Sequence, residues 1–248
     1  MNNLADGKII IDTTVDNSGA EKDIKSLSSK IGSMAKTSAT AVAGMVAAAT
    51  TAVATLAGLS VKQYAEYEQL TGGVETLFKN SSDKVMEYAN NAYKAAGMSA
   101  NEYMNTITGF AASLLQGLGG DTEKAAKIGN MAVEDMADNA NKMGTSIELI
   151  QNAYQGFAKQ NYTMLDNLKL GFGGTKEEMQ RLLQEASKIS GIKYDISNFS
   201  DIIEAIHVIQ NEMGITGTTA KEAASTIEGS LSMTKSAWTN LLTGMADD

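Results

Sequence analysis

The chain has 248 residues, 43% of them hydrophobic, which is enough to build a core in one large domain or two small ones. It contains no cysteine, so disulfides, thiolate metal sites and cysteine nucleophiles are excluded. The formal net charge is −9, Arg181 is the one arginine, and the lysines are scattered. The clustered positive charge that autonomous nucleic-acid binding requires is therefore missing. Proline, which breaks helix interiors, is also absent, and this favours long helices.

The N-terminal segment, residues 1–18, contains the one strand that the sequence predicts. β-Branched residues dominate and alternate along the stretch KIIIDTTVD, residues 8–16. Ser18 and Glu21 then form a capping-box pattern, which predicts the start of a helix. The first seven residues, MNNLADG, are polar and slightly acidic, unlike a secretion signal.

A long helix is predicted over residues 19–69, which corresponds to about 75 Å at 1.5 Å per residue. Its central part, residues 37–61, carries no charged side chain and consists mostly of Ala, Thr and Val. Small and apolar residues repeat there at spacings of four and three, as in a coiled coil or a helix bundle. This predicted helix-packing stripe consists of Val42, Val46, Ala49, Val53 and Leu56.

The uncharged stretch 37–61 is also long enough to cross a bilayer. Its four Val, two Leu and one Met contribute roughly −2 to −4 kcal/mol to insertion, while nine Ser, Thr and Gly residues oppose it. Insertion is thus near break-even, and packing against protein is favoured over a standing membrane helix. A membrane-active or pore-forming protein that uses residues 37–61 is the alternative.

From residue 70 the predicted helices become shorter and are separated by glycines. They divide into a helical module, residues 70–191, and a C-terminal helical pair, residues 192–248. The pair is expected to continue in a longer protein, because its last apolar stripe is still running at Met245. Four capping-box patterns mark helix starts. They pair Ser99 with Glu102, Thr145 with Glu148, Thr175 with Glu178, and Thr219 with Glu222.

Five amphipathic stripes with helical spacing accompany these starts. In the module they are Tyr103, Ile107, Phe110, Leu114 and Leu118; Ile147, Ile150, Tyr154 and Phe157; and Met179, Leu182, Ala186 and Ile189. In the pair they are Ile202, Ile206, Ile209 and Met213; and Ile227, Leu231, Thr234, Trp238, Leu241 and Met245. The predicted fold class is therefore mainly all-α, with a short N-terminal β-strand, a long Ala/Thr-rich helix and a multi-helix module.

No stretch of the sequence predicts a catalytic, cofactor-binding or metal site. The run from Gly171 to Lys176 contains glycines and a lysine, as phosphate loops do. In this run, however, Thr175 precedes the lysine, and a helical segment rather than a strand comes before it. A flexible turn that ends in a helix cap at Thr175 is predicted instead.

The only histidine, His207, has Glu204 three residues earlier on the same helix face. Di-iron bundles use this spacing twice, with two further carboxylates, so a single copy predicts a partly exposed helix residue. The other acidic residues of interest are expected on solvated helix faces and in N-terminal turns. They are Asp121, Glu123, Glu134, Asp135 and Asp138. The chain is therefore not expected to be an enzyme, and a cell-wall hydrolase in residues 64–191 is the weakest alternative.

Several stretches together resemble the N-terminal part of tail tape measure proteins of long-tailed bacteriophages and prophages. The opening DGKIIIDTTVDNSGAEKDIKSL is similar to the strand and helix that begin many of them, and an Ala/Thr stretch follows. The longest similar stretches are EYEQLTGGVETLF at 66–78, YANNAYKAAGMSANEYM at 88–104 and DNANKMGTSIELIQNAYQGFAKQNYTMLDNLKLGFGGTKEEMQRLL at 138–183. The final SAWTNLLTGMADD, with Trp238 as its anchor, is similar as well.

The resemblance, which covers nearly the whole chain, implies a structural protein of the virion. A tape measure protein lies inside the tail tube, sets the length to which the tube polymerises, and leaves the tail ahead of the DNA at genome ejection. The implied partners are copies of itself in the tail lumen, the tail tube protein, tail assembly chaperones, baseplate or tail-tip proteins and, at ejection, the host membrane. The implied locations are the tube lumen of the virion, the host cytoplasm during assembly and the host membrane on ejection. No cofactor is implied, and family members are usually far longer than this chain.

Overall fold

A computed structural model of the chain describes residues 62–223 and 227–244. All of these residues belong to one unit of the chain, Leu56–Asp248. Every regular element within the described ranges is a helix, so the predicted mainly all-α fold class is confirmed there. The predicted N-terminal strand, the capping box at Ser18, the uncharged stretch 37–61 and the packing stripe from Val42 to Leu56 lie outside the described residues.

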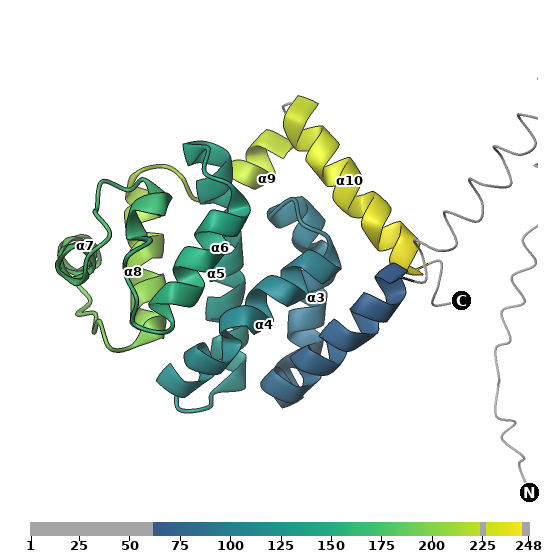
Figure 1. The fold of residues 1–248 in the computed structure, drawn as a ribbon, viewed down its shortest axis with the longest axis horizontal. Coiled ribbons are helices and arrows are strands. Elements are labelled where there is room, and N and C mark those ends of the chain that lie inside the picture. The colour runs from purple at the N-terminus through teal and green to yellow at the C-terminus, as the bar shows by residue number, and fades with distance from the viewer. Residues whose placement is uncertain (1–61, 224–226, 245–248) are drawn as a thin grey trace, which may run out of the picture. The chain divides into compact units, whose positions relative to one another are not determined.

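The described chain is a succession of helices joined mostly by short loops (Figure 1). A helical segment over residues 62–78 comes first and leads into the 3-10 turn η1, Lys79–Ser81. The elements that follow are α3 (Ser82–Ala95), α4 (Ala100–Gly117), α5 (Thr122–Met143), α6 (Ile147–Phe157), η2 (Leu165–Leu168), α7 (Lys176–Ser190), α8 (Phe199–Glu212), α9 (Thr218–Ala223) and α10 (Ile227–Gly244). No helix in the described ranges combines the length and apolar character that crossing a membrane requires.

Helix α5 runs through the middle of the domain and contacts α3, α4, α6, α8 and α9 (Figure 1). Small residues on α5 allow these neighbours to approach closely. Ala125, Ala126 and Ala132 are fully buried, and a Cβ added at Gly129 would lie 2.9 Å from Cδ1 of Ile107 on α4. Because α5 is covered by helices on most sides, the polar residues Asp135, Asp138 and Asn139 in its second half are buried against other parts of the domain.

The stripes predicted for α4 and α6 form the core, except that Leu118 and Ile147 at their ends are only partly buried and pack against it. Tyr103, Ile107, Phe110 and Leu114 of α4 are buried. On α6, Ile150, Tyr154 and Phe157 are buried as well, and the rings of Tyr154 and Phe157 lie 5.8 Å apart between centroids. These two helices therefore supply much of the aromatic interior of the domain.

The stripes predicted for α7 and α8 are confirmed except at their last positions. Met179, Leu182 and Ala186 of α7 are buried, as are the isoleucines of α8, whereas Ile189 is 49% exposed and Met213 is 46% exposed. The prediction is wrong for these two residues because they sit at the C-terminal ends of their helices, beyond the main body of the core.

The hydrophobic core continues across residue 191. Helix α8 packs against α4, α5 and α7, and Ile203, Ala205 and Ile206 on α8 are fully buried. The predicted division between residues 70–191 and 192–248 therefore falls between two helices, α7 and α8, that share one core.

Two of the predicted helix starts are capped by the expected serine or threonine side chain. The capping box of α4 is confirmed, since Ser99 Oγ accepts from the Glu102 amide at 3.3 Å and the Glu102 carboxylate accepts from the Ser99 amide at 2.8 Å. Thr175 caps α7 by accepting from the Glu178 amide at 3.2 Å. The Glu178 carboxylate, however, accepts from the amide of Gly173 instead of the Thr175 amide.

The other two capping-box predictions within the described residues are wrong. Thr145 Oγ1 donates to the carbonyl of Asn167 at 2.9 Å, and α6 begins after Ser146 without a side-chain cap. Thr219 lies inside α9, and its amide donates to Asp138 at 2.8 Å. In both cases the threonine forms a hydrogen bond with a residue distant in sequence instead of the predicted bond with the glutamate three residues later.

Helix α10 turns a polar side toward the rest of the domain. Ser236 Oγ donates to the carbonyl of Gly97 at 2.7 Å, and the amide of Ala100 donates to Asn240 Oδ1 at 2.9 Å. Trp238 is 48% exposed and Leu241 is 52% exposed, on the other side of the helix. The apolar stripe predicted for α10 is therefore wrong at Trp238 and Leu241, because the side of the helix that bonds to the rest of the domain carries Ser236 and Asn240.

Candidate functional site

A buried carboxylate of α5 is joined to the only histidine of the chain. The side chain of Asp135 is 1% exposed, and its two oxygens lie 2.9 and 3.0 Å from Nδ1 of His207 on α8. His207 itself is 33% exposed, so the prediction of a partly exposed helix residue is confirmed. The prediction that Asp135 lies on a solvated face is wrong, because α8 covers that side of α5.

A second buried carboxylate lies almost one turn further along α5. Asp138 is 2% exposed, Oδ2 accepts from the amide of Gly217, and Oδ1 accepts from the amide of Thr219 at 2.8 Å. Gly217 directly precedes α9 and Thr219 lies in its first turn, so Asp138 acts as the N-terminal cap that local sequence was expected to provide. The prediction of a solvated Asp138 is wrong, because the start of α9 packs against this part of α5. Glu222, the expected capping partner of Thr219, instead accepts from the side chain of Asn141 at 2.9 Å.

The remaining acids of this group behave as predicted or nearly so. Asp121 is exposed and caps the start of α5 by accepting from the Lys124 amide at 3.0 Å, and Glu123 is exposed in the first turn. Glu134 is half-buried, and its carboxylate accepts from the Asn130 side chain at 2.9 Å. Acidic residues thus stay in water at the N-terminal end of α5 and become buried only in its second half.

The electrostatics of the Asp135–His207 pair favour retention of a proton. Burial raises the pKa of Asp135 to about 6, although the hydrogen bond from His207 opposes the shift. The hydrogen bond to Asp135 raises the pKa of His207, and burial opposes that shift. The carboxylates of Glu134 and Asp138 push both pKa values in the same upward direction. The folded protein therefore keeps the proton of this pair to a higher pH than the separate groups do.

The chemical role that this geometry supports is a polar link between three helices. Asp135 connects α5 to α8, and Asp138 connects α5 to α9. Within the described ranges no three His, Asp or Glu side chains converge as a metal site would require. Glu204, which the sequence places on the same helix face as His207, is half-buried, and burial raises its pKa.

The stability of the domain is expected to fall as pH rises through the titration of the Asp135–His207 pair. Both folded-state pKa values lie above the unfolded values, so from about pH 4 until the pH exceeds the raised pKa of His207 the folded protein binds more protons than the unfolded chain. The stabilisation is present at the acid end of this window and is lost as pH rises. For Asp135, a pKa raised from 3.8 to about 6 corresponds to roughly 3 kcal/mol.

Urea unfolding of the wild type and of Asp135→Asn at pH 5 and pH 7.5 measures this effect. Asparagine can still accept a hydrogen bond from His207 but does not titrate. The wild type is therefore expected to lose more stability than Asp135→Asn between the two pH values. An equal pH dependence of the two proteins would contradict the assignment.

Arg181, the only arginine of the chain, stabilises the glycine-containing run from Gly171 to Lys176. Arg181 donates to the Glu178 carboxylate at 2.7 and 3.1 Å and to the carbonyl of Gly171 at 2.8 Å, and its guanidinium lies 4.3 Å from the ring centre of Phe172. The Glu178 carboxylate also accepts from the amide of Gly173 at 3.0 Å. These bonds lower the pKa of Glu178 to about 2, the one from Arg181 most strongly. The Glu178 carboxylate thus accepts the loop amide that a bound phosphate would otherwise contact, as expected for a structural turn.

The packing stripe Val42, Val46, Ala49, Val53 and Leu56 was the main site predicted from sequence, and it lies outside the described residues. The structure instead brings together α5, α8 and α9 through Asp135, Asp138 and His207, a grouping that sequence reasoning missed. The available signal was the run AVEDMADNA at residues 132–140, in which small and apolar residues surround the acids on all helix faces. Comparison with family models, curated proteins and solved structures finds no match to this chain.

Proposed function

We propose that this protein is the N-terminal portion of a phage or prophage tail tape measure protein, a structural protein that sets tail tube length and leaves ahead of the DNA at ejection. The observation that carries the proposal is the set of tape-measure-like stretches that spans nearly the whole sequence. The partners that follow are further copies of the chain, the tail tube protein, tail assembly chaperones, baseplate or tail-tip proteins and the host membrane.

The packing of the longest resembling stretch supports a structural role. Residues 138–183 comprise the end of α5, all of α6 and η2, and the first half of α7. Most of their large apolar side chains are buried in the common core, among them Phe157, Leu165 and Leu168, whereas Leu149 is exposed. The resemblance therefore falls on residues that hold helices together.

The predicted helix-packing stripe supplies the contact between copies in this proposal. Residues 37–61 carry no charge, and their Ala, Val and Thr side chains suit close packing of several helices about a common axis. The narrow lumen of a tail tube favours such packing, because it excludes wider arrangements of several copies. The Val42–Leu56 stripe is the surface at which the copies are expected to meet.

A length variant tests the proposed function. Six extra heptads inserted in register into the stripe, in the gene as it occurs in the phage or prophage genome, lengthen a continuous helix by roughly 60 Å. Electron microscopy of the resulting particles is expected to show tails longer by that amount. Wild-type tail length in particles that contain the lengthened protein would overturn the proposal.

Flotation of the full chain with liposomes tests the membrane alternative separately. That alternative requires the chain to bind liposomes and requires the double variant Val46→Asp, Val53→Asp to abolish the binding.

A further inference from the structure

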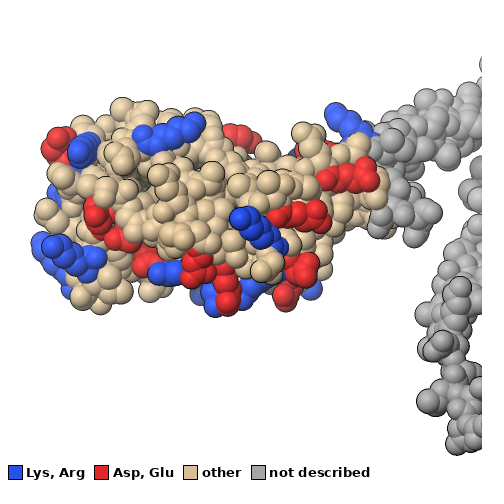
Figure 2. All heavy atoms as spheres, turned by 90° about the horizontal axis from the view of Figure 1, so that it is seen from below, with Lys and Arg blue, Asp and Glu red and all other residues tan. Residues whose placement is uncertain are grey.

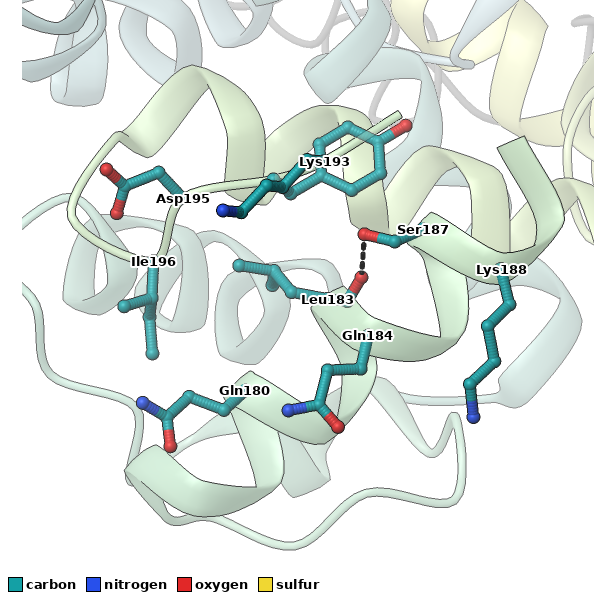
Figure 3. A pocket seen from close by; sticks show the side chains of 9 residues that line it. Gln180, Leu183, Gln184, Ser187, Lys188, Lys193, Asp195 and Ile196 are labelled. Atoms are coloured by element: carbon teal, nitrogen blue, oxygen red, sulfur yellow. Dashed lines mark hydrogen bonds between the residues drawn. The ribbon is translucent and has the colours of Figure 1, made fainter. Parts of the chain in front are cut away.

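A groove of about 950 Å³ lies between α7 and the segment that connects it to α8 (Figure 3). Gln180, Gln184 and Lys188 follow one another along the α7 side, while Lys193 and Ile196 come from the connecting segment across the groove (Figure 3). Leu183, which is 4% exposed, lies between the two sides and gives the groove an apolar base.

The connecting segment is fixed in place by hydrogen bonds from three other parts of the domain. The Tyr162 hydroxyl donates to the carbonyl of Ile196 at 3.0 Å, and the Tyr194 hydroxyl donates to Ser190 Oγ at 3.1 Å. The amide of Asp195 donates to the Asp201 carboxylate on α8 at 2.8 Å. The groove is therefore preformed, which lowers the entropic cost of binding a ligand there.

Two lysines, Lys188 and Lys193, and one carboxylate, Asp195, line the groove, so it carries more positive than negative charge. In the described residues, neither Lys188 nor Lys193 has an acidic partner within ion-pair distance. The one carboxylate on the rim, Asp195, accepts two hydrogen bonds from Ser197 at 2.8 Å; these bonds lower its pKa most, and the charge of Lys193 lowers it further. Over the face of the domain drawn in Figure 2, acidic and basic side chains are interspersed.

The spacing along α7 matches an extended peptide. Gln180, Gln184 and Lys188 are four residues apart, so successive side chains start about 6 Å apart along the helix axis. Alternate residues of an extended chain are about 6.8 Å apart. Each glutamine amide offers one acceptor and two donor hydrogens, the set needed to pair with peptide C=O and N–H groups. An extended peptide that lies along α7 can therefore place alternate residues opposite the side-chain amides of Gln180 and Gln184 and the ammonium group of Lys188.

We propose that this groove is a docking site for an extended, acidic peptide segment of a partner protein. The backbone of the segment pairs with Gln180 and Gln184, an apolar side chain lies on Leu183 and Ile196, and flanking carboxylates bind Lys188 and Lys193. The inference rests on the groove alone and does not depend on the proposed tail function.

Fluorescence anisotropy with the full-length chain tests the proposal, using the fluorescein-labelled peptide Glu-Ile-Asp-Leu-Glu-Ile-Asp as the probe. The probe is expected to bind saturably at low ionic strength, and binding is expected to weaken with added salt, because the lysines are exposed. The double variant Lys188→Glu, Lys193→Glu is expected to weaken binding by about tenfold or more, in line with the loss and reversal of two exposed charge contacts. The matched control Lys142→Glu, an exposed lysine on α5, is expected to change affinity less than about twofold.

Two further variants and two further probes complete the test. Gln180→Ala with Gln184→Ala is expected to weaken binding about threefold or more without altering its salt dependence, because only neutral hydrogen bonds are lost. No binding of the acidic peptide, or equal loss in Lys142→Glu and in the lysine double variant, would overturn the proposal. Tighter binding of an oligothymidylate or of phosphatidylserine vesicles through the same two lysines would overturn it in favour of a nucleic acid or a lipid surface. Circular dichroism of each variant confirms that the helices are retained.

Discussion

Replacement of Gly174 by alanine is expected to destabilise the domain by roughly 3 kcal/mol, the upper part of the range for overpacking. A Cβ at Gly174 would overlap the carbonyl oxygen of Thr163 and lie 2.9 Å from its carbonyl carbon. Backbone cannot rotate away as a side chain can, so the Gly171–Gly174 turn or the segment before η2 must shift. That shift disturbs the buried ring of Phe172 and the bonds that Arg181 makes to the turn.

Thermal unfolding followed by circular dichroism measures this effect. For a domain of this size, roughly 3 kcal/mol corresponds to a decrease in Tm of about 6–12 °C. The matched control is Gly72→Ala in the helical segment 62–78, where an added Cβ meets no atom within 4 Å. That change is expected to stabilise the protein by about 0.5–1 kcal/mol, because alanine is the better helix former. A Gly174→Ala protein as stable as the wild type would show that the close backbone approach is absent in solution.

The second large effect is expected for Asp138→Ala, which we estimate at about 3 kcal/mol from the loss of charge-assisted hydrogen bonds and of a helix cap. The substitution leaves the amides of Gly217 and Thr219 without their acceptor in a largely buried position. Helix α9 is short and begins at these amides, so its start should open first. Hydrogen exchange is expected to show faster exchange at Gly217 and Thr219, and urea unfolding gives the total loss of stability.

The control for Asp138→Ala is Asp121→Ala, which removes the exposed N-cap of α5. An exposed cap contributes about 1 kcal/mol, because water satisfies the freed amide of Lys124. Asp138→Asn should fall between wild type and alanine, since the amide oxygen replaces one of the two carboxylate acceptors. Equal losses in Asp138→Ala and Asp121→Ala would contradict the role of Asp138 as a buried link between helices.

The sequence predicts the core residues correctly in those helices that bury only one of their sides. Helices α4 and α6 bury one side, so the spacing of Tyr103, Ile107 and Phe110, or of Ile150 and Tyr154, identifies the core correctly. The capping box at Ser99 is equally local, because its two partners are three residues apart.

The parts that the sequence does not predict depend on contacts between distant residues. Helix α5 is covered on most sides, so helical periodicity cannot distinguish an acid that faces water, such as Asp121, from one that faces α8, such as Asp135. The partners of Asp135 and Asp138 lie more than 70 residues away along the chain. In α10, the polar residues Ser236 and Asn240 bind backbone groups of the α3–α4 region, which reverses the orientation that hydrophobicity predicts.

Because the outer face of α10 carries Trp238, the intrinsic fluorescence of the protein can report on binding at that face. Trp238 is the only tryptophan of the chain and is about half exposed, so its emission reports the environment of the outer face of α10 rather than that of the core. Any macromolecule that covers this face should shift the emission to shorter wavelength and protect the indole from acrylamide quenching. The aromatic interior is built from tyrosine and phenylalanine instead, among them Tyr103, Tyr154 and Phe157. When it is excited where tyrosine does not absorb, tryptophan emission therefore follows the outer surface of α10 and does not report on this aromatic core.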